Sequence, residues 1–144
     1  AEKGFIIVGQ ETDGTVTPLD LGMDWIVSKT KHDFIGKRAL SRSDMLKSDR
    51  KQLVGLLNEN ENEVIPEGSQ IVETLQPSPP MVMIGHVTSS YYSPNCNRSI
   101  SMALIKGGKE RIGETLYIPL KNKTIKVKVT DTLFFDKNGE RADG

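Results

Sequence analysis

The sequence predicts a mainly β fold, a small antiparallel β-barrel preceded by a short α+β segment. Thirteen glycines and seven prolines divide the 144 residues into short apolar runs, which is typical of short strands joined by turns. Residues 99–104, 115–120 and 124–129 alternate apolar and polar side chains, as strands with one buried face do. Helical spacing occurs in the first part of the chain, where we expect short helices.

The first part of the chain opens with a candidate strand. Residues 4–9, Gly-Phe-Ile-Ile-Val-Gly, form a continuous apolar run between glycines, which predicts a buried strand. Leu19, Met23 and Ile26 then follow one another at spacings of four and three residues. This spacing places them on one helical face and predicts a short helical turn.

A second short helix and a boundary follow. Residues 37–40 come directly after a glycine and are expected to begin a helix. Residues 41–51 are almost entirely polar or charged, so they should form a linker or a solvated surface helix. We therefore expect two units, residues 1–46 and residues 47–144.

The second unit should contain about six short strands, which fits a small antiparallel barrel or sandwich. Residues 121–122 separate the last two alternating runs and predict a tight hairpin. Pro119 lacks an N–H, so its position should be an edge or a bulge. A charge at Val127 should unfold this unit. The remaining strands are expected at 52–57, 70–73 and 82–88, and the expected core faces are Ile100, Met102 and Leu104; Leu116, Ile118 and Leu120; and Ile125, Val127 and Val129.

Composition excludes several classes of protein. Nineteen basic and nineteen acidic residues cancel, which argues against a general nucleic-acid binder. No apolar run approaches the length of a membrane helix, and no secretory signal is present, so we expect no membrane partner. Cys96 is the only cysteine, which fits a reducing cytoplasm. The chain opens at Ala1 directly into a strand-like run, so we expect a fragment of a longer polypeptide.

The sequence offers few candidates for chemistry. It has no glycine-rich phosphate loop, paired-histidine zinc helix or cysteine cluster, so no catalytic or metal-binding residue is predicted. His32 lies in a polar stretch and should be on the surface, and His86 should be an ordinary histidine of a sheet. Cys96 has only Arg98 close by in sequence, which is weak support for a reactive thiol.

Three surface features remain as candidates. Tyr91 and Tyr92 are expected on a loop, where they pack on the barrel or form one wall of a ligand site. Four lysines, described here as the lysine hairpin, should form a solvated sheet face or, alternatively, a nucleic-acid surface. Phe134 and Phe135 should close the barrel or pack on a neighbouring domain. The lysine hairpin consists of Lys121, Lys123, Lys126 and Lys128.

Short motifs along nearly the whole chain resemble the aminomethyltransferase folate-binding family. Those of the first unit resemble the closing segment of the folate-binding domain, and those of the second resemble the C-terminal barrel of the same proteins. Each motif is weak alone, but their shared order is specific. The motifs are Glu2-Lys3-Gly4, Gly9-Gln10-Glu11, Thr17-Pro18, Gly22, Trp25 and Asp33-Phe34-Ile35-Gly36-Lys37, then Leu53-Val54-Gly55-Leu56, Pro66-Glu67-Gly68, Gly85-His86-Val87-Thr88-Ser89, Ser93-Pro94 and Ile100 to Ala103.

Within this family, residues 2–10 and 134–141 resemble the α subunit of heterotetrameric sarcosine oxidase. The glycine-cleavage T-protein usually carries Leu-Tyr-Gly where Ile7-Val8-Gly9 stands here. The resemblance implies a parent enzyme that demethylates sarcosine at a flavin on another subunit. It also implies that tetrahydrofolate captures the one-carbon unit as 5,10-methylenetetrahydrofolate, while the dinucleotide (NAD) lies elsewhere in the α subunit.

The family's catalytic aspartate and most of its pterin contacts lie upstream of this segment, so no catalytic residue is carried over. Arg141, in the polar tail at 136–144, is the one candidate for cofactor binding, because a guanidinium can pair with a folate carboxylate. The implied partners are the rest of the α subunit and the other subunits. The alternatives are a fragment of the T-protein, and a freestanding barrel that binds through Tyr91 and Tyr92 or through the lysine hairpin.

Overall fold

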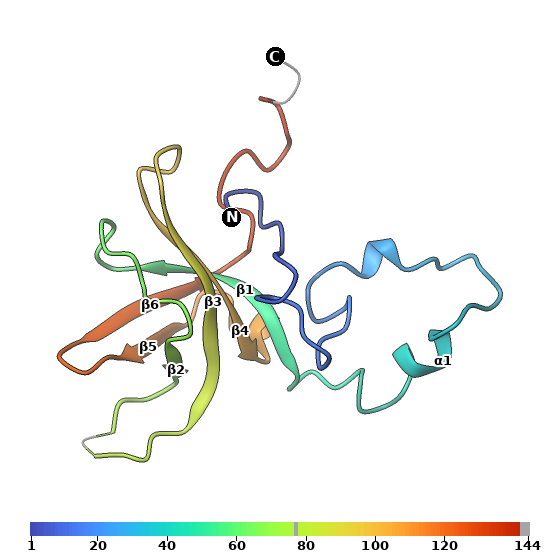
Figure 1. Ribbon diagram of the computed structural model, residues 1–144, viewed down its shortest axis with the longest axis horizontal. Helices are drawn as coiled ribbons and strands as arrows, with labels where there is room; N and C mark the ends of the chain where they lie inside the picture. Colours follow the sequence, from blue (N-terminus) through green and yellow to red (C-terminus); the bar gives the residue numbers. More distant parts are fainter. Residues whose placement is uncertain (77, 142–144) are drawn as a thin grey trace.

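The computed structural model describes residues 1–76 and 78–141. Six antiparallel strands close into a barrel in the order β1-β4-β3-β2-β5-β6, which confirms the predicted fold class. The first fifty residues lie on the outside of this barrel and extend away from it (Figure 1). The strands are β1 (Lys51–Asn58), β2 (Gln70–Val72), β3 (Met83–Ser93), β4 (Arg98–Lys106), β5 (Thr115–Pro119) and β6 (Thr124–Thr130).

The β5–β6 hairpin follows the predicted alternation. Ile118 pairs with Ile125, and the inward residues of both strands are buried in the barrel interior. Pro119 is the last residue of β5 and lies beyond the one pairing of β5 with β2, at Tyr117. Its missing N–H therefore removes no hydrogen bond between β5 and β2. The sheet edge that we expected at this position is not found, because the barrel is closed.

The predicted core face of β4 is wrong. Ala103 and Ile105 point into the barrel, whereas Met102 and Leu104 belong to a second apolar cluster on its outer surface. The alternation could not distinguish the two faces because both are buried. We call this second cluster the outer apolar patch; it comprises Leu53, Met102 and Leu104, covered by Ile6, Val16, Leu21 and Phe134.

A glycine lets the chain cross the outer face of β1. A Cβ at Gly55 would lie 2.2 Å from the Asp131 carbonyl oxygen and 2.8 Å from the Phe134 ring. Only a residue without a side chain fits there, so Phe134 can pack against the barrel as part of the outer apolar patch. This confirms that Phe134 packs on the barrel.

The buried strand predicted at 4–9 is wrong. Residues 4–7 are irregular, and Phe5 and Val8 are 76% and 87% exposed. A strand needs a partner edge, and the closed barrel offers none. The helical structure in residues 1–50 consists of a 3₁₀ turn, Asp24–Ile26, and of α1, Lys37–Leu40. Both were predicted.

The rest of the N-terminal segment, which we define as residues 1–50, is made of turns and irregular chain. Residues 41–49 form exposed turns around a partly covered Met45, which agrees with the predicted linker. No helix among the described residues is long and apolar enough to cross a membrane.

Residues close to the N-terminus contact the chain that follows β6 (Figure 1). The Glu2 carbonyl accepts hydrogen bonds from the backbone N–H groups of Phe134 and Phe135, at 3.0 and 3.1 Å. Lys3 forms an ion pair of 2.8 Å with Asp136, and its hydrogen bond lowers the pKa of that carboxyl. The last three residues of the predicted polar tail lie outside the described residues.

Candidate functional site

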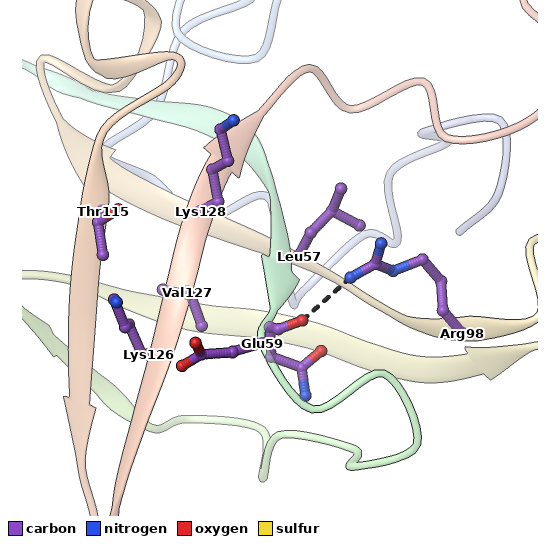
Figure 2. A pocket seen from close by; sticks show the side chains of 8 residues that line it. Leu57, Glu59, Arg98, Thr115, Lys126, Val127 and Lys128 are labelled. Atoms are coloured by element: carbon purple, nitrogen blue, oxygen red, sulfur yellow. Dashed lines mark hydrogen bonds between the residues drawn. The ribbon is translucent and has the colours of Figure 1, made fainter.

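Two adjoining cavities lie on the outside of the barrel where β1 ends and β4 begins. The first, of about 440 Å³, extends to Lys126 and Lys128 on β6 (Figure 2). The second, of about 360 Å³, extends to Phe135 and Lys137 in the C-terminal segment. Leu57 and Arg98 line both cavities, and we call the two cavities together the basic groove.

Arg98 is the fixed positive charge at the centre of the basic groove. Its Nη2 donates a hydrogen bond of 3.0 Å to the Asn58 carbonyl, and its Nη1 lies 3.3 Å from a carboxylate oxygen of Glu61 (Figure 2 shows the first contact). Its Nε is buried and has no acceptor among the described residues. These contacts hold the guanidinium in place and leave part of its hydrogen-bonding capacity unused.

The sequence reasoning did not identify Arg98 as a site residue. Its contacts come from residues some forty positions earlier in the chain. The only local signal is an arginine at the first position of a strand, and such a position carries no particular chemistry. The groove therefore became visible only when β1 and β4 were placed together.

The lysine hairpin supplies the charge at the other end of the basic groove. Lys126 and Lys128 alternate with the buried Val127, so their side chains point outward, as predicted for a solvated face. Lys123 pairs with Glu63 instead. Within residues 1–76 and 78–141, neither Lys126, Lys128 nor Lys137 forms an ion pair.

Arg141 lies beside the opposite end of the groove. Its guanidinium carbon is 4.9 Å from the centroid of the Phe135 ring, and Phe135 lines the second cavity. A cation at this distance over an aromatic face is a favourable contact. The exposed Arg141 side chain leaves its hydrogen-bonding edge accessible, and a role in cofactor binding stays a prediction.

The two histidines lie apart from the groove. His32 is exposed, as predicted, and His86 is half-buried in β3. Burial, and secondarily the positive charge of Lys51, lower the pKa of His86 below its ordinary value. No group of three or more metal-ligating side chains occurs in the part of the chain that the structure describes.

Tyr91 and Tyr92 are not on a loop, which corrects the prediction. They belong to β3, which continues through a bulge near Val87 to Ser93. Both are partly exposed and line a separate cavity of about 310 Å³ beside Phe5. Ser89 and Ser90, which precede the two tyrosines in β3, are both buried.

Cys96 lies at the edge of the groove. Its thiol is partly buried, and its recorded polar contact is with the Phe134 carbonyl oxygen at 3.8 Å. A carbonyl cannot accept the thiol proton as a base, so this contact does not activate the sulfur.

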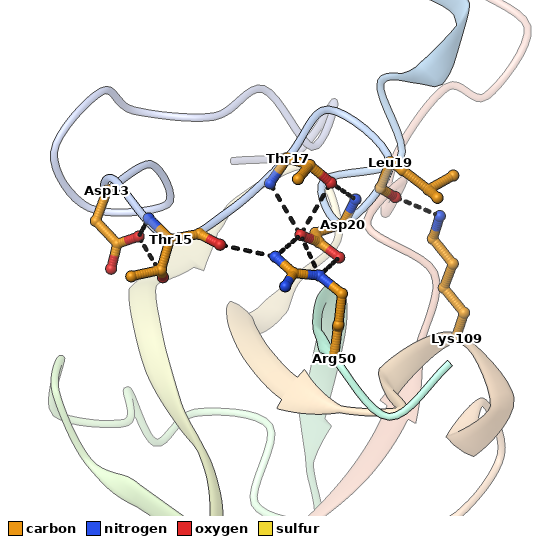
Figure 3. Close-up of polar contacts among 7 residues, drawn as sticks. All are labelled: Asp13, Thr15, Thr17, Leu19, Asp20, Arg50 and Lys109. Atoms are coloured by element: carbon orange, nitrogen blue, oxygen red, sulfur yellow. Dashed lines mark hydrogen bonds and ion pairs between the residues drawn. The ribbon is translucent and has the colours of Figure 1, made fainter. Parts of the chain in front are cut away.

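A second charged cluster joins the N-terminal segment to the barrel (Figure 3). Asp20 is buried and accepts hydrogen bonds from Arg50 at 2.7 Å and from the Thr17 backbone at 2.8 Å. Arg50 also donates to the Thr15 carbonyl, and the Leu53 N–H donates to the Asp20 carbonyl. We call this cluster the Asp20 network.

The Asp20 network is structural. Burial alone would raise the pKa of Asp20, but the hydrogen bonds from Arg50 and Thr17 outweigh it and lower the pKa. The pKa of Arg50 is raised by the same contact. Each charge is satisfied by the other, so neither group is available for proton transfer.

Comparison with known proteins gives consistent results. The family model of the glycine cleavage T-protein C-terminal barrel domain matches residues 51–136. The sarcosine oxidase α subunit of Corynebacterium sp. (strain P-1) is 51% identical over 149 residues, covering 100% of this chain and 15% of that protein. The corresponding subunit of Rhizobium meliloti (strain 1021) is 34% identical over 142 residues, covering 97% of this chain and 14% of that protein.

Aminomethyltransferases are also similar. That of Clostridium botulinum (strain Langeland) is 35% identical over 138 residues, covering 94% of this chain and 35% of that protein. The crystal structure of aminomethyltransferase T of the glycine cleavage system from Bartonella henselae has the same fold, with a TM-score of 0.80 at 24% identity, covering 94% of this chain and 37% of that one.

These comparisons confirm the resemblance found in the sequence motifs. The chain spans only about 15% of the length of the sarcosine oxidase subunits that it matches. The matched family model covers β1 through β6 and the segment that crosses Gly55. The chain belongs to the family of glycine cleavage T-protein C-terminal barrel domains.

Proposed function

We propose that this chain is the C-terminal part of a folate-dependent sarcosine oxidase α subunit, and that its barrel supports the tetrahydrofolate site. The observation that carries the proposal is the similarity over the entire chain to two sarcosine oxidase α subunits, at 51% and 48% identity. Fold alone would not distinguish this function from others, because one fold hosts many activities.

The proposed reaction assigns no bond-making step to this chain. A flavin bound elsewhere in the enzyme would supply the oxidation, by accepting a hydride from the N-methyl group of sarcosine. Tetrahydrofolate, when bound, would supply the acceptor of the one-carbon unit, so that the products would be glycine and 5,10-methylenetetrahydrofolate. The flavin, the dinucleotide and the catalytic carboxylate are held by other parts of the assembly, and this chain contributes a wall of the folate pocket.

The N-terminal segment supports a place within a larger polypeptide. Phe5, Val8, Trp25 and Ile35 are all strongly exposed, and Ile35 is fully exposed. Exposed apolar side chains that gather on one segment mark a surface that packs on another part of a protein. We infer that residues 1–46 complete the folate-binding domain and that residues 47–144 form the separate barrel domain.

Arg141 and the basic groove fit the acidic end of tetrahydrofolate. Arg141 stacks on Phe135 and keeps its guanidinium edge accessible for a carboxylate. Arg98 and Lys137 place further positive charge along the same groove. Cationic side chains outnumber the one carboxylate, that of Glu59, among the residues that line the groove, which suits a supporting role in holding an anionic ligand.

The test compares this chain with the full polypeptide encoded by its gene. Calorimetry should show tetrahydrofolate binding by the full polypeptide and none at micromolar concentrations by residues 1–144 alone. In the assembled enzyme, sarcosine turnover should yield 5,10-methylenetetrahydrofolate when folate is present. Micromolar binding by the isolated chain, or turnover that never depends on folate, would contradict the proposal.

Arg141→Ala in the full polypeptide should weaken tetrahydrofolate binding about 10-fold or more, as expected for loss of a charge-assisted hydrogen bond. The matched control is Arg42→Ala, because Arg42 is exposed and its one ion pair among the described residues is with the neighbouring Asp44. Equal affinities for both variants would remove Arg141 from the site.

A glycine-cleavage aminomethyltransferase is the second candidate. The 35% identity to the Clostridium botulinum enzymes favours it, as does the share of their length that this chain covers. The two candidates differ in the donor of the one-carbon unit. Formation of methylenetetrahydrofolate from an aminomethyl-lipoyl donor, without oxidation of sarcosine, would favour the aminomethyltransferase.

A further inference from the structure

We propose that Lys3 is a positioning residue for Arg141: by holding Asp136, it fixes the polar tail so that the Arg141 guanidinium is presented to the cofactor. This inference rests on the proposed function, in which Arg141 pairs with a carboxylate of tetrahydrofolate. It adds that a residue of the N-terminal segment, 133 positions before Asp136 in the sequence, controls where that contact lies.

The ammonium group of Lys3 contacts Asp136 at two atoms. Its Nζ lies 2.8 Å from Oδ2 of the carboxylate and also donates a hydrogen bond to the Asp136 carbonyl oxygen. The two side chains are 35% and 10% exposed, so water screens this ion pair less than it screens a fully exposed pair. Lys3 therefore restrains both the main chain and the side chain of Asp136.

The main chain turns at Asp136. Its φ of +50° lies in the left-handed region, which residues other than glycine adopt infrequently. The Gly139 N–H donates to the Asp136 carbonyl oxygen at 3.1 Å, which closes the turn. Lys3 contacts the same carbonyl oxygen, so loss of the lysine should let the turn relax.

Contacts within the tail connect this turn to Arg141. The hydrogen bond from Lys3 is the main influence that lowers the pKa of the Asp136 carboxyl. The backbone N–H groups of residues 140 and 141 lower this pKa further, so they also act on the carboxylate that Lys3 holds. The guanidinium carbon of Arg141 lies 4.9 Å from the centroid of the Phe135 ring. The position of Arg141 thus depends on the two residues at which the tail begins.

Glu2 holds the aromatic ring on which Arg141 stacks. Its carbonyl oxygen accepts the backbone N–H of Phe135 at 3.1 Å. Its carboxylate accepts hydrogen bonds from Ser93 at the end of β3 and, at 2.9 Å, from Asn95 in the turn that follows. Because Glu2 is fastened to the barrel in this way, the ammonium group of the next residue is a fixed point of attachment rather than a mobile one.

A fixed tail should strengthen the binding of tetrahydrofolate. A segment that is ordered before it meets its ligand loses less conformational entropy on binding than a mobile segment does. The Arg141 side chain is exposed and long, so its main-chain position and its stacking on Phe135 decide whether a carboxylate can meet the guanidinium edge. Loss of Lys3 should therefore weaken binding through Arg141.

The first test is a double-mutant cycle on tetrahydrofolate affinity, measured by calorimetry with the full polypeptide. Lys3→Met keeps most of the length of the side chain but removes its charge, and it should weaken binding about 3-fold or more. In the Arg141→Ala background the same substitution should weaken binding by less than about 1.5-fold, because the two residues act as a unit. Lys3→Arg keeps a charged donor and should bind within about 2-fold of the unmodified protein.

The second test measures the tail directly. Trypsin should cleave after Lys137 about 3-fold or more faster in Lys3→Met than in the unmodified polypeptide, because cleavage requires the tail to open locally. Cleavage after Lys47, in the exposed linker, is the internal reference and should not change. The matched control is Lys29→Met, which removes an exposed ion pair of the N-terminal segment with Asp24. It should alter neither the cleavage of the tail nor the affinity.

The outcomes separate this inference from the proposed function. Unchanged cleavage after Lys137 in Lys3→Met, or equal losses of affinity with and without Arg141, would overturn the inference while the proposed function stands. Failure of the unmodified polypeptide to bind tetrahydrofolate would overturn both.

Discussion

The barrel, residues 51–130, and the N-terminal segment, residues 1–50, bury opposite kinds of side chain. Among the described residues, the fully buried hydrophobic side chains all lie between Leu53 and Val129. The N-terminal segment instead buries Glu11, Thr17 and Asp20 and leaves Trp25 and other large apolar side chains exposed. The barrel is therefore stabilised by its own apolar interior, whereas the segment depends on polar contacts and on the outer apolar patch.

The physical reason for the difference is closure. Each strand of the barrel has two partners, so its backbone groups are paired and both faces of β4 can be buried. The N-terminal segment has no strand partner, and its buried polar groups must find local ones. The Glu11 carboxylate, for example, accepts the Ile7 N–H at 2.7 Å. The segment should consequently open at a lower free energy than the barrel.

The largest effect should come from a charge inside the barrel. Ile125→Asp removes an apolar side chain worth about 1.5–3 kcal/mol and buries an unpaired carboxylate, so unfolding of the barrel should become easier by more than about 4 kcal/mol. Urea unfolding followed by circular dichroism would measure it. Thr124→Asp, at the exposed neighbouring position, should change stability by less than about 0.5 kcal/mol. Equal losses would disprove the register of β6.

An intermediate effect should separate the two regions. Asp20→Asn keeps the shape of the side chain but removes its charge, which should destabilise the attachment of the N-terminal segment by about 1.5–3 kcal/mol. Hydrogen exchange followed by mass spectrometry should show faster exchange at residues 15–21 and unchanged exchange in β6. Faster exchange throughout the barrel would mean that the two regions unfold together.

Acid should produce the same local opening in the unmodified chain. The folded pKa of Asp20 lies below its ordinary value of about 3.9. The Asp20 network therefore makes its full contribution to the free energy that holds the N-terminal segment on the barrel at any pH above about 3.9. It is lost as the pH falls through the folded pKa and the carboxylate is protonated. Protection of residues 15–21, the ratio of the intrinsic to the observed exchange rate, should therefore fall in acid more steeply in the unmodified chain than in Asp20→Asn.

The smallest effect on stability should come from the exposed apolar surface. Trp25→Ser combined with Ile35→Ser should change unfolding free energy by no more than about 0.5 kcal/mol, because both side chains are exposed. The same pair should reduce self-association of the isolated chain in sedimentation experiments. Lys47→Ser, at an exposed polar position, should leave association unchanged. An unmodified chain that remained monomeric at high concentration would contradict this prediction.

The parts of the fold that the sequence predicted are those in which local pattern and burial agree. The β5–β6 hairpin has one face inside and one in water, so alternation alone identifies both. The apolar run at 4–9 has the composition of a buried strand, but composition does not say whether a partner is present. β4 fails for a related reason, since a strand buried on both faces carries no sign of which face is interior.

The site was less predictable than the fold. Family resemblance suggests Arg141 as a candidate, and its role stays a prediction, whereas the position of Arg98 depends on β1 and β4 lying side by side. The Asp20–Arg50 pair joins residues thirty positions apart, across a stretch that reads as a linker. An ion pair between distant positions needs only one charged residue at each position. It therefore produces no periodic pattern in the sequence.

Successive residues of β4 point into two separate apolar clusters. One is enclosed in the barrel interior, and the other is the outer apolar patch, which is covered by chain without regular structure. Side-chain volume at 103 and 105 is therefore fixed by the closed ring of strands, whereas volume at 102 and 104 can change together with the covering loops. A protein engineer could graft a different covering segment onto this strand without redesigning the interior.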